Sequence, residues 1–151
     1  MRIVVDDLSG AEVIELLQTH VAEMLDNSPE DSMHALDVDA LRKPEITLWS
    51  VWEGDDIAGC GAVKELDPMH GEIKSMRMVE AWRGHGVATL LLEHILGVAR
   101  ERGYTRLSLE TGSSEFYSPA VRLYERHGFA LCGPFAEYTD DPHSVFMTRE
   151  L

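Results

Sequence analysis

The sequence predicts an α/β fold in which a mixed, mostly antiparallel sheet of about six to seven strands is flanked by about four helices. Three short apolar segments in the middle of the chain are joined by tight turns, a pattern typical of antiparallel strands. The third segment runs into a glycine-rich turn that opens into an apolar helix. The chain has 151 residues, of which 44% are hydrophobic, and it contains no repeat or linker. We therefore expect a single domain over residues 1–151.

The first third of the chain is expected to contain one strand and one main helix. Residues 2–5 are a β-branched run that predicts a short strand. Ser9-Gly10-Ala11-Glu12 matches a capping box and predicts the start of a helix. Four apolar residues follow at helical spacing, namely Ile14, Leu17, Val21 and Met24. Residues 26–44 are rich in turn-forming residues and predict an irregular loop with one short helix.

The middle of the chain predicts a hairpin, a further strand and a long helix. Residues 46–53 and 57–65 pair across Gly54-Asp55-Asp56. A second turn, over residues 67–71, precedes a strand at 72–79. The helix is expected from about residue 85 to 102, because Gly103 is favoured just beyond a helix C-terminus.

The last third predicts three strands and a helix. Residues 106–111 form a strand with Leu107 and Leu109 on one face. Ser118-Pro119 predicts the cap and first turn of a helix that reaches His127, where Gly128 closes it. The remaining strands are expected at residues 129–135 and 144–148.

Composition narrows the range of partners and locations. The net charge is −14, spread over several acidic pairs, and such a field repels nucleic acid and anionic membranes and favours cationic partners. The two cysteines, Cys60 and Cys132, are far apart and do not form a disulfide framework. No leader-like or membrane-spanning segment is present, so we expect a cytoplasmic protein. Metal-binding motifs such as Cys-x-x-Cys are absent, and no metal is expected.

The glycine-rich turn is the most informative segment. In Arg83-Gly84-His85-Gly86-Val87-Ala88, backbone N–H groups at the start of a helix lack partners, and the helix dipole favours negative charge there. Glycine leaves the backbone open to a ligand. The turn therefore predicts a phosphate-binding site. A plain helix-capping turn remains open as an alternative.

A dinucleotide-binding turn is the other alternative, but it fits less well. Gly84 and Gly86 match the first two glycines of that motif, whereas Thr89 stands in the third place. Strands joined by tight turns precede the segment, unlike the βαβ repeats of a dinucleotide fold. A Walker A loop is excluded because no Gly-Lys-Ser/Thr follows.

The pattern Arg-x-x-Gly-x-Ala resembles the acetyl-CoA loop of the GNAT family of N-acetyltransferases. The resemblance continues through Leu123-Tyr124-Glu125-Arg126-His127-Gly128-Phe129, which carries the family's usual tyrosine, and the two motifs cover about residues 45–151. Residues 28–36, Gly59-Cys60-Gly61-Ala62 and residues 141–147 are similar to a bacterial group of acetyltransferases. With these segments the resemblance covers nearly the whole chain.

The resemblance implies that acetyl-CoA is the co-substrate. The expected pyrophosphate site consists of Arg83, Gly84, His85, Gly86, Val87 and Ala88. The backbone at Met76 and Met78 is expected to hold the pantetheine arm, while their side chains fill the core. Many family members also place an asparagine seven residues before the tyrosine. Here that position is Tyr117, which puts this particular contact in doubt.

Acetyl transfer to an amine needs an acid for the leaving thiolate and a base for the amine proton, because alkylamines are mostly charged at pH 7 (pKa about 10.4). The resemblance implies Tyr124 as the acid and Glu72 as the base. Glu110, or a water chain, is the alternative base. A ping-pong route through Cys60 or Cys132 is also conceivable. However, neither cysteine has a histidine partner in the sequence, and a structural role is the simpler interpretation.

The acceptor is expected to be a small cationic amine. Acidic residues are frequent in the segment where this family usually builds its acceptor pocket: Asp26, Glu30, Asp31, Asp37 and Asp39. His34 and Glu110 are candidate contacts to the acceptor. A non-catalytic acyl-CoA sensor or interaction protein on the same fold is the competing hypothesis, and a homodimer is left open.

Overall fold

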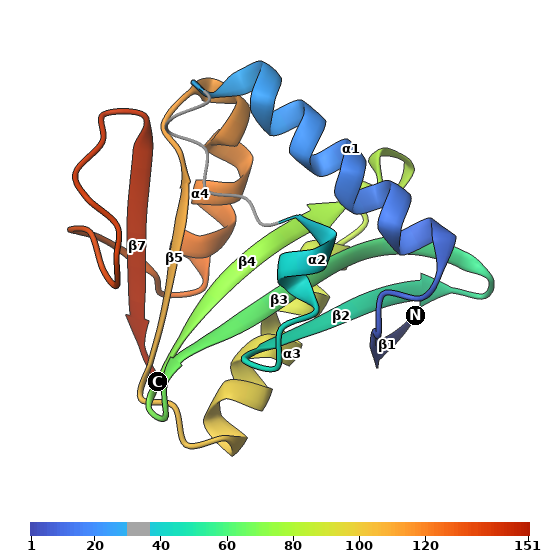
Figure 1. Ribbon diagram of the computed structural model, residues 1–151, viewed down its shortest axis with the longest axis horizontal. Helices are drawn as coiled ribbons and strands as arrows, with labels where there is room; N and C mark the ends of the chain where they lie inside the picture. The colour runs from blue at the N-terminus through green and yellow to red at the C-terminus, as the bar shows by residue number, and fades with distance from the viewer. Residues whose placement is uncertain (30–36) are drawn as a thin grey trace.

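The computed structural model describes residues 1–29 and 37–151, and within them a seven-stranded sheet forms the centre of the molecule (Figure 1). The strand order is β1-β2-β3-β4-β5-β7-β6. Only β4 and β5 are parallel; every other pair is antiparallel. The strands are β1 (Arg2–Val5), β2 (Ile46–Glu53), β3 (Asp56–Asp67), β4 (His70–Met78), β5 (Arg106–Gly112), β6 (Ala130–Cys132) and β7 (Ser144–Glu150). The predicted mixed, mostly antiparallel sheet is therefore confirmed.

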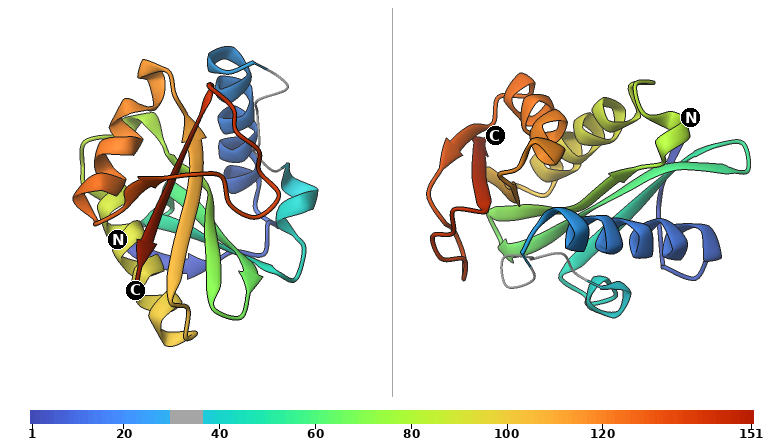
Figure 2. Two further views of the ribbon diagram at one scale, coloured as in Figure 1. Left: turned by 90° about the vertical axis from the view of Figure 1, so that its left-hand side faces the viewer. Right: turned by 90° about the horizontal axis from the view of Figure 1, so that it is seen from above.

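Helices cover both faces of the sheet, as the view from above in Figure 2 shows. On one face lie α1 (Ala11–Asn27) and α2 (Val38–Leu41). On the other face lie α3 (Val87–Glu101) and α4 (Ser118–Arg126). Two short 3-10 helices, η2 (Glu80–Trp82) and η3 (Glu115–Tyr117), precede α3 and α4. No helix in residues 1–29 and 37–151 is both long and apolar enough to cross a membrane.

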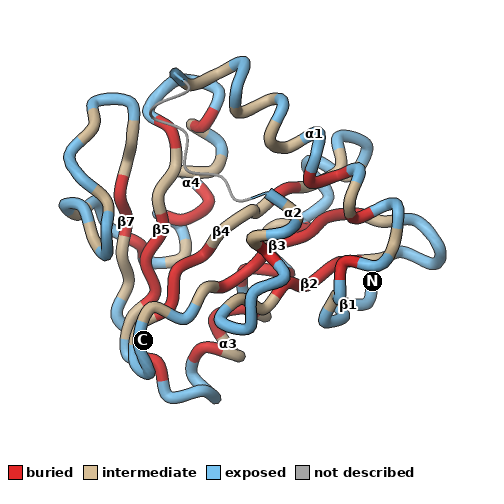
Figure 3. Tube along the Cα trace, in the orientation of Figure 1, coloured by how far each residue is buried: buried red, intermediate tan, exposed pale blue. Residues whose placement is uncertain are grey.

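Each face of the sheet has its own core. The larger core joins the sheet to α3 and α4 and includes Leu91, Leu92 and Ile95, all without exposed surface. The smaller core lies under α1 and α2 and includes Leu17 and Leu41. Figure 3 shows the buried residues following the central strands and the inner side of α3. The middle of the sheet is thus a fixed support for the residues at its edges.

Two details of α1 differ from what the sequence indicated. The capping box does not form, because the Ser9 hydroxyl donates to the Asp7 carboxylate and Gly10 caps α1 without a side-chain bond. The buried face of α1 contains Val13, Leu16 and Leu17, whereas Ile14, Val21 and Met24 are only half-buried. Apolar residues lie around much of this helix, so periodicity alone did not identify the inner face.

Three element boundaries also differ from the predictions. Strand β4 does not lead directly into the glycine turn, because η2 lies between them. Helix α3 begins only at Val87, two residues later than expected. Ser118 is the first residue of α4, capped by Tyr117. Strand β6 ends at Cys132, just before Gly133-Pro134, because proline has no N–H to donate to a ladder.

The feature that positions the site is the separation of β4 from β5. Their parallel pairing ends at Ile73 and Leu109, although both strands continue. Beyond Ile73, β4 remains paired with β3 while β5 follows β7 (Figure 1). At Ser75, φ is +56°, where the register of β4 against β3 shifts across Gly61. Such a bulge turns the strand, and one edge of β4 is left without a neighbouring strand.

Candidate active site

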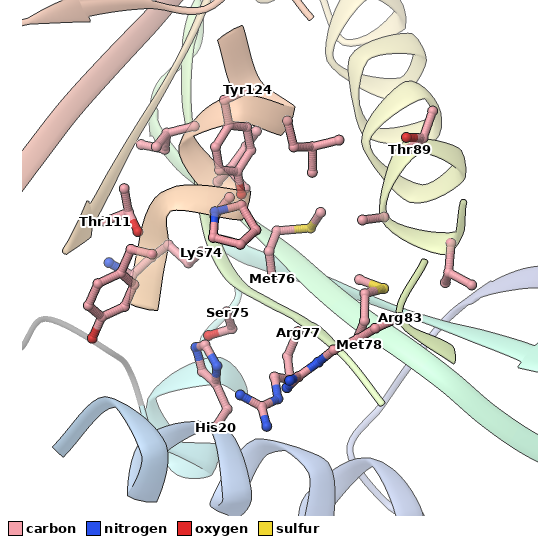
Figure 4. Close-up of a pocket in the computed structure, with 18 of the residues that line it drawn as sticks. His20, Lys74, Ser75, Met76, Arg77, Met78, Arg83, Thr89, Thr111 and Tyr124 are labelled. Atoms are coloured by element: carbon pink, nitrogen blue, oxygen red, sulfur yellow. The ribbon is translucent and has the colours of Figure 1, made fainter. Parts of the chain in front are cut away.

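A cavity of about 560 Å³ lies where β4 and β5 separate. Its wall is built from α1, β4, the glycine turn, the start of α3, β5, α4 and Tyr138 of the segment between β6 and β7. Figure 4 shows the side chains that project into it. Elements far apart in the sequence therefore contribute to one site.

The glycine turn forms one end of the cavity. Gly84 and Gly86 have φ of +77° and +79°, a conformation that other residues rarely adopt. No described atom lies within 4 Å of where a Cβ would stand on either glycine. The backbone N–H groups of Gly84, Gly86, Val87 and Ala88 have no hydrogen-bond partner among the described residues. They provide a concave set of donors of the kind that binds phosphate.

Five of the six residues predicted for this turn line the cavity, and one does not. Arg83, Gly84, Gly86, Val87 and Ala88 are part of the lining. His85 is exposed; its Nδ1 lies 3.1 Å from the Arg83 carbonyl oxygen and its ring contacts Trp82. The left-handed glycines on either side of His85 turn its side chain away from the cavity.

Met76 and Met78 line the cavity and also pack against the core beneath α3. A Cβ on Gly61 would stand 2.4 Å from the Met76 sulfur, and one on Gly59 would stand 2.5 Å from that of Met78. Glycines on β3 therefore make room for these side chains, which fill the core as expected. The backbone of this part of β4 faces the gap opposite β5.

Tyr124 of α4 is buried, and its hydroxyl points into the cavity (Figure 4). That hydroxyl has no hydrogen-bond partner in the described part of the chain, while its ring packs edge-on against Phe129. Burial raises the pKa of the Tyr124 phenol well above its usual range. At neutral pH the phenol is protonated and can donate a proton or a hydrogen bond.

Glu72 is 3% exposed and is hydrogen-bonded within a group of three side chains. Its Oε2 accepts from Lys74 Nζ at 3.1 Å and from the Tyr138 hydroxyl at 2.5 Å. Lys74 also donates to the Tyr138 hydroxyl at 3.0 Å. Burial first, and then the Glu72 carboxylate, raise the pKa of Tyr138 above its usual range. A buried carboxylate is stable here because an ammonium and a hydroxyl replace water around it.

Glu110, the alternative base, lines the same cavity from β5. Its Oε2 accepts from the Ser144 hydroxyl at 2.7 Å, and the residue is half-buried. Both candidate bases therefore lie at the cavity, on the two strands that separate.

The side of the cavity towards α1 contains His20, Ser75 and Arg77, here called the α1 wall (Figure 4). Within the described residues, the side-chain atoms that are completely removed from solvent and have no hydrogen-bond partner are His20 Nδ1, Ser75 Oγ and Arg77 Nε. Such an atom costs about 1–3 kcal/mol when nothing satisfies it. All of these atoms belong to the α1 wall.

The charge of the α1 wall comes from arginine. Arg77 Nη1 donates to Glu23 Oε2 at 2.6 Å, and Arg83 Nη2 lies 3.9 Å from the same oxygen. His20 is neutral at pH 7, because burial and, to a lesser extent, Arg77 lower its pKa to about 4. Two guanidinium groups therefore share one carboxylate beside the cavity.

The sequence did not identify several of these residues. Lys74 could have been found, because Glu72 and Lys74 are two apart on a strand and share a face. Nothing in the sequence links Tyr138 or His20 to β4. Tyr117 lines the cavity, and its hydroxyl lies 2.6 Å from the Ser28 hydroxyl, so it joins the end of α1 to η3.

The acidic segment proposed for the acceptor does not line the cavity in the described residues. Asp26, Asp37 and Asp39 are exposed and are not part of the lining. Glu30, Asp31 and His34 lie outside the described residues. Over residues 1–29 and 37–151, no cluster of histidine, cysteine and carboxylate side chains could hold a metal ion.

Comparison with known protein families gives a clear match. Residues 13–129 match the model of the acetyltransferase (GNAT) family. The chain is 55% identical to the uncharacterized N-acetyltransferase YsnE of Bacillus subtilis over 151 residues, covering 100% of both chains. It is 51% identical to the uncharacterized N-acetyltransferase YedL of Escherichia coli over 97% of this chain and 92% of that one. It is 35% identical to the IAA acetyltransferase of Azospirillum brasilense, covering 92% and 90%.

Solved structures agree on the fold. A structure assigned as an acyl-CoA N-acyltransferase from Klebsiella pneumoniae superposes with a TM-score of 0.84 at 28% identity, covering 99% of this chain and 97% of that one. A GNAT family acetyltransferase from Elizabethkingia anophelis with acetyl-CoA bound gives a TM-score of 0.69 at 17% identity, covering 99% and 97%. At that identity the second structure is evidence for the fold alone.

The two thiols differ in burial and in reactivity. Cys60 on β3 has no exposed surface, and burial, followed by the nearby Asp6, raises its pKa to about 12. Cys132, at the end of β6, is only partly buried, and burial raises its pKa as well. Because the thiolate is the nucleophile, Cys60 is unsuited to a covalent step in the folded protein.

We therefore expect iodoacetamide at pH 8 to modify Cys132 and leave Cys60 intact in the native protein. A pKa of about 12 leaves on the order of one Cys60 thiol in 10⁴ ionised at that pH. Peptide mass mapping with and without denaturant measures this, and both cysteines should react once the chain is unfolded. Rapid native modification of Cys60 would contradict its assignment as a structural thiol.

Proposed function

This chain belongs to the GNAT acetyltransferase family and is an acetyl-CoA-dependent N-acetyltransferase, and we propose that it moves the acetyl group directly to a primary amine of a small acceptor. The observation that carries the proposal is the composition of one cavity. Unpaired backbone donors, a protonated phenol and two carboxylates all line it. Direct transfer needs these functions and no covalent enzyme intermediate.

The cofactor end is assigned to the glycine turn. We assign the pyrophosphate to the backbone of Arg83–Ala88, and the open space at Gly84 and Gly86 supports a close approach by an anion. The Arg83 guanidinium lies at this end and adds positive charge. His85 is left out of this proposal, because its side chain is directed elsewhere and its backbone N–H donates to the Trp82 carbonyl oxygen at 3.3 Å.

The free edge of β4 is assigned to the pantetheine arm. Because β5 leaves β4 after Ile73, the backbone at Met76 and Met78 can pair with an extended ligand in place of a strand. The whole of residues 1–151 is proposed to act as one domain, since the sheet, both helical layers and the cavity draw on nearly its full length.

Tyr124 is proposed to protonate the leaving thiolate. Acetyl-CoA supplies an activated acyl group whose sulfur departs as a thiolate and needs a proton. The Tyr124 hydroxyl is unpartnered, faces the cavity and keeps its proton at neutral pH. A protonated phenol without another partner can donate a hydrogen bond or its proton to the departing thiolate.

Glu72 is proposed to take the proton of the amine, directly or through a water. Its contacts with Lys74 and Tyr138 fix its orientation and compensate its burial. These contacts also occupy Glu72 Oε2, so Glu110 and a water chain remain alternatives. The acceptor amine would arrive as an ammonium ion, attracted by these carboxylates.

The identity of the acceptor is open. The relative from Azospirillum brasilense is named for acetylation of IAA, and the other two relatives carry no acceptor in their names. The proposed acceptor is a small molecule whose primary amine is an ammonium ion at neutral pH. The acidic loop segment does not support a further preference for cations, because the described members of that segment face solvent.

The first test of this proposal is Gly86→Leu, which should weaken acetyl-CoA binding about 100-fold or more. The side chain would fill the space assigned to the pyrophosphate and remove several charge-assisted hydrogen bonds. Gly54→Leu is the matched control, because Gly54 also has positive φ and open space but lies in a distant hairpin. Isothermal calorimetry should show normal binding for the control. Binding of NAD but not acetyl-CoA by the unmodified protein would refute the assignment.

A second test addresses the acid. Tyr124→Phe keeps the ring against Phe129 and removes the hydroxyl, so kcat should fall about 10²–10⁴-fold with little change in acetyl-CoA affinity. Tyr104→Phe is the control, since it removes another buried tyrosine hydroxyl, bonded to Glu65, away from the cavity. Release of free CoA measures the rate. An unchanged kcat when chemistry limits the rate would remove Tyr124 from the mechanism.

A third test separates the two candidate bases. A base must be deprotonated to accept a proton, so kcat/KM falls at low pH as its carboxylate is protonated. Glu72→Gln should lower kcat/KM about 10²–10⁴-fold and flatten this acidic limb, whereas Glu110→Gln should leave the limb in place. The opposite result would move the assignment to Glu110. Acetyl-CoA binding without CoA release for any amine would favour a non-catalytic sensor.

A further inference from the structure

The α1 wall has hydrogen-bonding capacity that the folded chain does not use. The unpartnered atoms are His20 Nδ1, Ser75 Oγ and Arg77 Nε, and they come from α1 and from β4. Among side-chain nitrogens and oxygens that are completely removed from solvent in residues 1–29 and 37–151, no other lacks a partner. Apart from the Tyr124 hydroxyl, to which the proposed function already gives a role, the unused capacity lies on one side of the cavity.

The wall lies next to the part of β4 that is assigned to the pantetheine arm. Ser75 and Arg77 flank Met76, whose backbone is assigned to the pantetheine arm. The Met76 side chain points towards α3, whereas Arg77 points towards α1 and bonds Glu23 there. A ligand on the α1 wall would thus contact the same stretch of β4 from the face of the sheet opposite to the Met76 side chain.

The charge of the wall is suited to an anion. Arg77 and Arg83 share the single carboxylate of Glu23, whose side chain is 35% exposed. Arg77 itself is 9% exposed, so its charge is poorly screened by water. His20, neutral at pH 7, can donate a hydrogen bond without adding charge.

We propose that the acceptor carries a carboxylate as well as its amine, and that Arg77, Ser75 and His20 bind this carboxylate. This inference rests on the proposed function, because it names the substrate class of the same site. A carboxylate matches the planar edge of a guanidinium and accepts from a hydroxyl and an imidazole N–H together. These donors are already largely removed from water, so little further desolvation opposes binding. The acceptor is then an amino acid or a close analogue, with its amine directed towards Glu72 and Glu110.

The test uses matched pairs of amines that differ only in the carboxylate. Suitable pairs are phenylalanine with phenethylamine, methionine with 3-(methylthio)propylamine, and lysine with cadaverine, each assayed for CoA release. In at least one pair the carboxylate-bearing member should have a kcat/KM about 10–100-fold higher, the range expected for hydrogen bonds to a charged group. Equal or better use of the decarboxylated member in every pair would overturn the proposal.

Variants distinguish binding from a structural role of Arg77. Arg77→Gln and Glu23→Gln both break the same ion pair, but only the first removes the guanidinium. Arg77→Gln should raise KM about 10–100-fold for the carboxylate-bearing member and leave KM for its decarboxylated partner unchanged. Glu23→Gln should not raise either KM. Ser75→Ala, which leaves the ion pair in place, should raise KM for the carboxylate-bearing member alone.

The outcomes also separate this inference from the proposed function. If Arg77→Gln and Glu23→Gln change both members of a pair alike, Arg77 only holds α1 on β4 and the inference is wrong, while the acetyltransferase proposal stands. If no member of any pair releases CoA from a protein that binds acetyl-CoA, the proposed transfer to a small amine fails, and the inference with it. Thermal unfolding of each variant confirms that the fold is retained.

Discussion

The separation of β4 from β5 is the constraint on which the rest of the structure depends. Two parallel strands that paired along their full length would leave no room for a ligand and no free backbone. Here the register shift around Ser75, opposite Gly61, keeps β4 attached to β3 while its other edge turns away from β5. The unpaired edge would be unfavourable in a closed core. It persists because a cavity, open to ligands, lies beside it.

Strand alternation then gives the cavity two chemically different sides. Met76 and Met78 point towards α3, where Gly59 and Gly61 leave space for them, so this side is apolar and closely packed. Arg77 points towards α1, where its charge is met by Glu23. At the paired end of β4, Lys74 and Glu72 neutralise each other. Buried ion pairs contribute little net stability, but they fix which side chains face the cavity and in which orientation.

The sequence predicted the parts of this arrangement that depend on local chemistry. Turn glycines, strand alternation and the helix that follows the glycine turn were identified, and Gly84 and Gly86 indeed have positive φ. The sequence could not predict contacts set by long-range packing. Tyr138 meets Glu72 across 66 positions, and His20 reaches β4 only because α1 packs with Val13, Leu16 and Leu17 inward. Where local rules failed, a neighbouring group competed, as Asp7 did for the Ser9 hydroxyl.

The same geometry would allow a short segment of β4 to contact two substrates, as the proposed function requires. Ser75, Met76 and Arg77 are consecutive, yet the bulge gives access to the strand from both faces and along its free edge. On the proposed function, one substrate pairs with the edge and the other approaches from the α1 side, so the reacting atoms meet without a moving domain. The positions of both substrates then depend on one strand held firmly by β3. Rigid support of this kind favours direct transfer, because proximity and orientation supply much of the rate.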